Sequence, residues 1–230
     1  MKTPVRPTPH PIRDAAPADE SRRVFVRQLA LGATALGTLP LAACGGSDND
    51  PEVRFAHGVA SGDPLADRVV LWTRVTPPAG HTADIPVQWE LASDAAFTTV
   101  VAKGQATATA AKDFTVKVDA TGLKPATAYH YRFKAYAAQS AAARTRTLPT
   151  GSVAQVKLAV FSCANYPAGY FNVYAEAARR NDLDATVHLG DYLYEYPRGG
   201  YASANAEQLG RLELPATEIL TLADYRMRHA

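Results

Sequence analysis

Three side chains in the last third of the sequence can bind a metal ion through an anionic atom: the thiol of Cys163, the carboxyl of Asp191 and the phenol of Tyr194. A cation would deprotonate all three groups. Phenolate is a hard and strongly charged oxygen donor, so this set suits Fe(III) better than Mg²⁺ or Zn²⁺. The second oxygen of Asp191 can bridge to a harder cation, and water held between two metals attacks phosphate esters.

Two apolar runs that predict strands lead to these residues. The run "VKLAVFSC" ends at Cys163 and "DATVHLGD" ends at Asp191, with the helical spacing of "FNVYAEAARRND" between them. Strand, helix and strand in this order predict parallel neighbours joined by a right-handed crossover. Continuous apolar runs also predict strands that are buried on both faces.

The two strand ends should therefore share one edge of the sheet, which is where open α/β sheets bind ligands. Cys163 and Asp191 would meet there. Tyr194 lies on the loop that follows Asp191 and can turn back to the same point. His188 alternates away from this side of the strand, so we expect a core residue and assign it no role.

Residues 53–150 have another pattern, with short strands roughly ten residues apart and no long amphipathic helix, which predicts a β-sandwich. The predicted strands are "RVVLWTRV", "IPVQWELA", "TTVVAKGQA", "FTVKVDA", "AYHYRFKAY" and "ARTRTL". In "TGLKPATAYHYRF", Leu123, Pro125, Thr127 and Tyr129 resemble the tyrosine corner of a fibronectin type III-like domain.

Residues 1–44 have the composition of an export signal. Arg22 and Arg23 precede an apolar run, which resembles a twin-arginine signal read by the twin-arginine export machinery. The apolar stretch 28–43 contains a proline and is shorter than the roughly 20 residues of a membrane span. "LAAC" ends at Cys44 and resembles a lipoprotein cleavage box, which would attach the protein to a membrane through lipid. Cleavage after a small-residue triplet, with Cys44 unmodified, is the alternative.

Charge and cysteine content narrow the function classes. The chain has 24 basic and 22 acidic residues, and without residues 1–43 the counts are 18 and 19, so no nucleic-acid-binding function is indicated. Only two cysteines are present. If Cys44 carries lipid, Cys163 has no internal disulfide partner in an oxidising compartment, and it must be buried or bound to a ligand. Residues 45–52 form a polar, glycine-containing linker.

Three stretches in order, "FAHGVASGDPLADRVVLWTRVTP", "FSCANYPAGYFNVY" and "VHLGDYLYEY", resemble the PhoD-type alkaline phosphatases. The resemblance begins near Phe55 and continues to Ala230. It implies an exported iron- and calcium-dependent phosphatase that is periplasmic, at the cell surface or secreted, and that hydrolyses phosphate monoesters and diesters. It also implies a β-sandwich over 53–150, followed by a calcineurin-like α/β metallophosphatase domain.

Individual site residues also follow from this resemblance. Cys163 and Tyr194 match the Fe(3+) ligands of the family, and Asp191 matches the carboxylate that bridges to Ca(2+). Asn165 in "SCANY" lies beside these residues, and we expect it to touch substrate or a nearby water.

The sequence departs from the family where it stops, at "LADYRMRHA". The resemblance implies further motifs beyond this point, with an aspartate and histidine pair and more calcium ligands. Of the six histidines, only His188 and His229 fall within 154–230, so we expect an incomplete catalytic domain there. We therefore expect the 230-residue chain to be a truncated piece with weak metal retention and no useful turnover.

Two other interpretations remain open. A purple acid phosphatase-like enzyme also combines a sandwich with a "GD" motif and a tyrosine, but it should present a carboxylate after the first strand, where "FSCANY" has none. A lipid-anchored β-sandwich binding module should end at a domain boundary. The spacing of "TEILTLADYRMRHA" instead predicts a helix without a glycine or proline stop signal.

Overall fold

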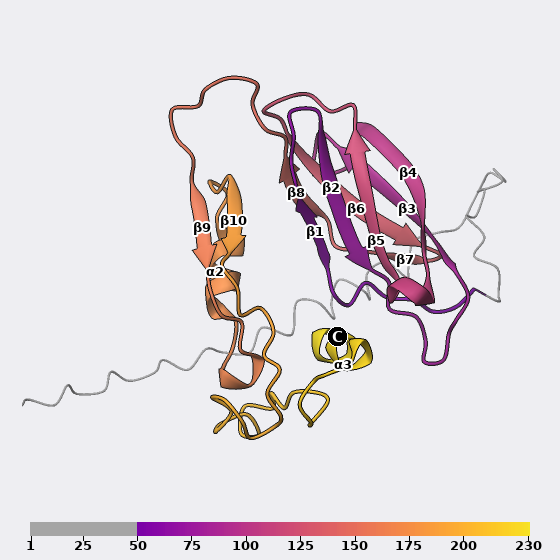
Figure 1. The fold of residues 1–230 in the computed structure, drawn as a ribbon. Coiled ribbons are helices and arrows are strands. Elements are labelled where there is room, and N and C mark those ends of the chain that lie inside the picture. The colour runs from indigo at the N-terminus through magenta and orange to yellow at the C-terminus, as the bar shows by residue number, and fades with distance from the viewer. Residues whose placement is uncertain (1–49) are drawn as a thin grey trace, which may run out of the picture. The chain divides into compact units, whose positions relative to one another are not determined.

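The structure, a computed structural model, describes residues 50–230 (Figure 1). The predicted export signal, including Arg22, Arg23 and Cys44, lies outside the described residues. Within 50–230, no helix has both the length and the apolar character needed to cross a membrane. The strands are β1 (Val59–Gly62), β2 (Arg68–Arg74), β3 (Ile85–Ala92), β4 (Val100–Ala108), β5 (Thr115–Thr121), β6 (Ala128–Ala135), β7 (Ala138–Gln139), β8 (Ala143–Arg146), β9 (Leu158–Phe161) and β10 (Ala185–His188). The α-helices are α2 (Asn172–Arg179) and α3 (Leu222–His229), and the 3-10 helices are η1 (Ala110–Lys112) and η2 (Tyr166–Ala168).

Two antiparallel sheets make up the first part of the fold. One has the strand order β1-β2-β5 and the other β4-β3-β6-β7, with β8 also paired to β6. Burial alternates with a period of two along β2 and β6, because successive side chains of a strand point to opposite faces. The predicted sandwich is present, and its six predicted strands correspond to β2–β6 and β8. The short strands β1 and β7 carry too little apolar pattern to be predicted.

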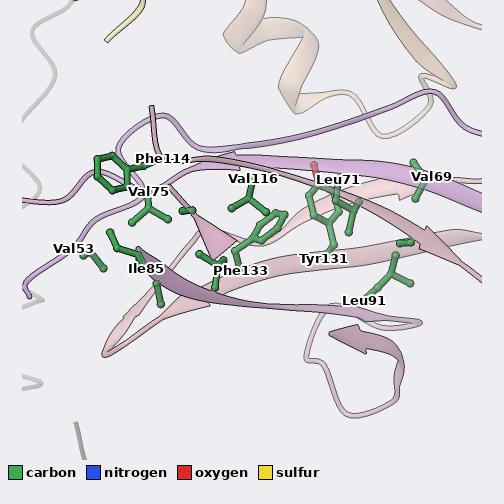
Figure 2. Packing of buried hydrophobic residues seen from close by; sticks show 14 of the residues in the cluster. Val53, Val69, Leu71, Val75, Ile85, Leu91, Phe114, Val116, Tyr131 and Phe133 are labelled. Atoms are coloured by element: carbon green, nitrogen blue, oxygen red, sulfur yellow. The ribbon is translucent and has the colours of Figure 1, made fainter. Parts of the chain in front are cut away.

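The inward-facing side chains of both sheets form one hydrophobic core (Figure 2). Leu71 and Val116 come from the first sheet, whereas Ile85, Tyr131 and Phe133 come from the second, and all five are nearly or fully buried. The hydroxyl of Tyr129 accepts a hydrogen bond of 2.9 Å from the backbone N–H of Lys124, which is the contact expected of a tyrosine corner.

The second part of the fold begins with β9, continues through α2 and returns in β10. The two strands are parallel, with Leu158 opposite Ala185 and Phe161 opposite His188. Helix α2 packs against β9 because the rings of Tyr174 and Phe161 are in edge contact, with centroids 4.8 Å apart. The predicted order of strand, helix and parallel strand is therefore confirmed.

The expectation that both strands are buried on both faces is wrong for the described residues. Val160 in β9 remains 56% exposed and Leu189, just after β10, remains 69% exposed. The physical reason is that, within residues 50–230, β9 and β10 pair only with each other, so a two-stranded sheet leaves apolar side chains in contact with water.

Helix α3 begins later than the pattern over 217–230 predicts. Thr221 caps its first turn in a reciprocal capping box: the Thr221 hydroxyl accepts from the N–H of Asp224, and the Asp224 carboxylate accepts from the N–H of Thr221. This pair fixes the first helical residue at Leu222.

Candidate metal centre

The loops that leave β9 and β10 lie against each other through backbone hydrogen bonds. The N–H of Cys163 donates to the carbonyl of Gly190 at 3.0 Å, and the N–H of Ala164 donates to the carbonyl of Asp191 at 2.8 Å. These bonds carry the parallel pairing past the strand ends. They bring the thiol of Cys163 to the carboxylate of Asp191, with Sγ 3.3 Å from Oδ2.

Both residues adopt left-handed backbone conformations, with φ of 67° at Cys163 and 53° at Asp191. Aspartate tolerates this region better than most residues, whereas cysteine has no such preference. The left-handed conformation costs roughly 1–2 kcal/mol for an L-residue, so the surrounding contacts must supply this energy. Strain of this kind often concentrates where side chains are held for function.

Tyr194 completes the group. Its hydrogen bond with Cys163 is the largest cause that raises the pKa of the Tyr194 phenol, and desolvation and the nearby Asp191 carboxylate act in the same direction. Without a cation, the phenol therefore keeps its proton. A bound cation would reverse this preference, because it stabilises the phenolate.

The chemistry of these donors fits a bound metal ion. A thiol, a carboxyl and a phenol share hydrogen bonds at one point, and a cation could replace the protons that they share. Across residues 50–230, no three His, Cys, Asp or Glu side chains gather in one metal-binding group. The group described here differs because its third donor is the phenol of Tyr194.

Asn165 is connected to Tyr194 by Tyr201, which contacts both residues. Its side-chain NH₂ lies 3.5 Å from the carbonyl of Tyr201, and the Tyr201 ring stacks on the Tyr194 ring with centroids 5.6 Å apart. Asn165, Tyr194, Tyr201, Glu213 and Arg228 line a cavity of about 30 Å³, which has room for a water molecule. The Asn165 Oδ1 and Glu213 Oε2 atoms are buried and have no hydrogen-bond partner among the described residues.

Arg228 fixes the loop that carries Tyr194. Its guanidinium donates to the carbonyls of Tyr194 and Tyr196 on this loop. It also donates to a second segment, at Leu214 (2.9 Å) and Pro215 (3.0 Å). A planar guanidinium carries five N–H donors, so one side chain can join both segments.

The sequence interpretation missed three residues that support the site. Arg228 is one, and its position in α3 gives no sign of the carbonyls that it contacts. Tyr174 and His188 are the others, hydrogen-bonded to each other at 3.0 Å. Helical spacing places Tyr174 on the face of α2 that packs on the sheet, but spacing does not indicate a partner for its hydroxyl.

Comparison with known proteins gives consistent matches. Residues 41–149 match the family described as PhoD-like phosphatase, N-terminal domain, and residues 158–230 match the family described as PhoD-like phosphatase. Alkaline phosphatase D from Bacillus subtilis (strain 168) is 39% identical over 210 residues, a match that covers 88% of this chain and 35% of the relative.

A solved structure described as "Structure of PhoD" agrees with these sequence matches. It is 42% identical, with a TM-score of 0.71, over 76% of this chain and 34% of that chain. The chain thus spans about a third of the length of the relatives it matches. Because both family regions, the curated relative and the solved structure agree, the chain belongs to the PhoD-like phosphatase family.

Proposed function

We propose that this chain contributes the first metal ligands of an enzyme that hydrolyses phosphate esters. The observation that carries the proposal is the convergence of Cys163, Asp191 and Tyr194 at the ends of two parallel strands. Cys163 and Tyr194 would hold Fe(3+), and Asp191 would use its second oxygen to bridge to Ca(2+). When bound, these ions supply the Lewis acidity that activates water towards phosphorus.

The protein residues around the ions would hold and orient the substrate. Asn165 is proposed to contact a water or a phosphate ester: its buried Oδ1, which has no partner among the described residues, would accept from a water, and its NH₂ would donate to a phosphate oxygen. Arg228 would hold the backbone of Tyr194 through its carbonyl, and Tyr201 would hold the Tyr194 ring by stacking on it. Monoesters and diesters are both proposed substrates, in keeping with the family.

The proposal extends to the domains and to localisation. The sandwich over 53–150 is proposed to be fibronectin type III-like, and residues from 154 onward to belong to a calcineurin-like metallophosphatase domain. Arg22 and Arg23 would direct export by the twin-arginine machinery, and Cys44 would carry lipid on the exported protein. Replacement of Cys44 by serine should then release soluble protein or block processing, whereas a soluble wild type processed elsewhere would contradict the lipid anchor.

The iron site is tested by colour. The test uses a catalytically active protein that contains Cys163, Asp191 and Tyr194. In this protein, Fe(III) bound by the phenolate of Tyr194 should produce a visible charge-transfer band. Tyr194→Phe should abolish the band and the hydrolysis of a chromogenic phosphodiester together. Tyr192→Phe, which changes a tyrosine two positions away with an exposed ring, should retain both. A band that survives Tyr194→Phe would contradict the ligand assignment.

A further inference from the structure

Two residues without an assigned role, Tyr174 and His188, form a hydrogen-bonded chain between the loops of the metal centre. The ring nitrogen Nδ1 of His188 lies 3.3 Å from the backbone N of Gly190. The other ring nitrogen, Nε2, lies 3.0 Å from the hydroxyl oxygen of Tyr174. That hydroxyl lies 3.4 Å from the carbonyl oxygen of Cys163.

The direction of each hydrogen bond follows from the donors. A backbone N–H can only donate, so Nδ1 of His188 must accept from Gly190 and carry no proton. The proton of the neutral ring then sits on Nε2, which donates to the Tyr174 oxygen. The Tyr174 hydroxyl keeps its own proton free to donate to the carbonyl of Cys163. All three bonds are therefore satisfied by one tautomer of one neutral histidine.

The hydrogen bonds of His188 and Tyr174 fix backbone groups of the two left-handed loops. The carbonyl of Gly190 already accepts from the N–H of Cys163, so both polar backbone groups of Gly190 and of Cys163 are fixed. Tyr174 is itself anchored by edge contacts with Phe161 at 4.8 Å and Phe171 at 5.5 Å between ring centroids. The hydroxyl is thus presented to the loop from a packed aromatic ring.

We propose that His188 and Tyr174 are positioning residues that hold Cys163 and Asp191 in their left-handed conformations. His188 acts on the loop of Asp191 through the N–H of Gly190, and Tyr174 acts on the loop of Cys163 through its carbonyl. The functional meaning of this role rests on the proposed metal centre, but the positioning itself is a property of the metal-free protein.

Hydrogen exchange of the metal-free full chain tests the proposal at individual loops. Tyr174→Phe removes the hydroxyl and keeps the ring. We expect the amides of Cys163 and Ala164 to exchange about three- to tenfold faster, which is the factor that one net hydrogen bond contributes to an opening equilibrium. Tyr170→Phe is the matched control, because its hydroxyl donates to the carbonyl of Leu209 instead, and it should leave these amides unchanged.

Two substitutions of His188 test its two hydrogen bonds separately, the one to Gly190 and the one to Tyr174. Asparagine can place an oxygen near the Nδ1 position but is too short to reach Tyr174, so His188→Asn should loosen Cys163 and keep Gly190 protected. Glutamine can place an NH₂ near the Nε2 position but leaves Gly190 without an acceptor, so His188→Gln should give the reverse pattern. A merely destabilising change would loosen both loops together.

Each exchange result either supports or overturns the positioning role of His188 and Tyr174. The crossed pattern supports the proposal even if Tyr174→Phe fails to fold. Equal loosening of both loops in His188→Asn and His188→Gln, or no change in either variant, overturns it. Because exchange is measured without iron or substrate, a protein that shows the crossed pattern and binds no iron would reject only the proposed function.

Discussion

The thiol Sγ of Cys163 lies 3.3 Å from the Oδ2 atom of Asp191, although 28 positions separate the two residues in sequence. The parallel register of β9 and β10 places their strand ends side by side, and backbone bonds between the two loops complete the approach. Two donors of different chemistry thus meet because of topology, in loops whose backbone is left-handed at both positions.

Relief of the strain at Cys163 should be measurable. Cys163→Gly should give a higher free energy of unfolding than Cys163→Ala by about 1 kcal/mol, because glycine adopts a φ of 67° without steric cost. Urea denaturation of both variants checks this difference. At the neighbouring Ser162, which does not have a positive φ, the order should be reversed, with alanine more stable than glycine. The same order at both positions would argue against strain at Cys163.

The tyrosine corner should stabilise the sandwich. Tyr129→Phe leaves the Lys124 N–H without the hydroxyl oxygen that accepts its hydrogen bond. The free energy of unfolding should fall by about 1 kcal/mol, measured by urea denaturation. Tyr136→Phe is the control, since its hydroxyl has no hydrogen-bond partner among the described residues, and it should change stability little. A loss of equal size in both variants would mean that the hydroxyl bond of Tyr129 contributes nothing specific.

Glu90 should make the sandwich sensitive to acid. Its carboxylate bridges Arg132 at 2.8 Å and Lys134 at 2.9 Å on the neighbouring strand. Desolvation acts to raise the pKa of Glu90, but the hydrogen bonds from Lys134 and Arg132 outweigh it and hold the pKa below its ordinary value. A depressed pKa in the folded state means that the contribution is present above the unfolded pKa, about 4.3, and is lost as pH falls through the folded value.

Glu90→Gln should therefore lower the free energy of unfolding by about 1 kcal/mol at neutral pH and by progressively less below about pH 4. Thermal or urea unfolding at several pH values measures the difference. Glu176→Gln removes an exposed pair with Arg179 and should show little effect across the same range. A Glu90→Gln difference that stays constant down to low pH would contradict the assigned pKa direction.

The sequence predicted those parts of the fold that depend on local pattern. Alternating burial in β6 and the apolar runs before Cys163 and Asp191 follow from one-dimensional spacing, and so did the parallel order of β9 and β10. The burial of side chains in β9 and β10 could not be predicted from spacing, because the burial of Val160 depends on which segments pack over the sheet. The assignment of Cys163, Asp191 and Tyr194 as metal ligands stays a prediction, although their side chains meet where strand topology places them.

The supporting contacts of the site could not be predicted for a different reason. Strand alternation does not reveal the Tyr174 hydroxyl that comes from α2 to meet His188. Likewise, the carbonyls bound by Arg228 belong to loops whose paths no periodicity describes. Contacts from side chains to loop backbone require the three-dimensional path of the loop.

Arg228 provides the last prediction, because it joins two loop segments that have no regular structure of their own. Lysine carries the same charge but cannot direct several planar donors at separate carbonyls, so Arg228→Lys should free the segment that contains Tyr194 and Tyr196. Chymotrypsin, which cleaves after aromatic residues, should then cut this segment roughly tenfold faster, as expected when about 1.4 kcal/mol of local stability is lost.

Arg198→Lys is the matched control for this experiment. Among the described residues, the Arg198 side chain donates one hydrogen bond, 2.8 Å to the carbonyl of Glu213, which a lysine ammonium can largely replace. Cleavage of this variant should stay near the wild-type rate. If both variants are cut equally fast, the site loop depends on positive charge in general, and the shared binding of several carbonyls by one guanidinium does not hold Tyr194 in place.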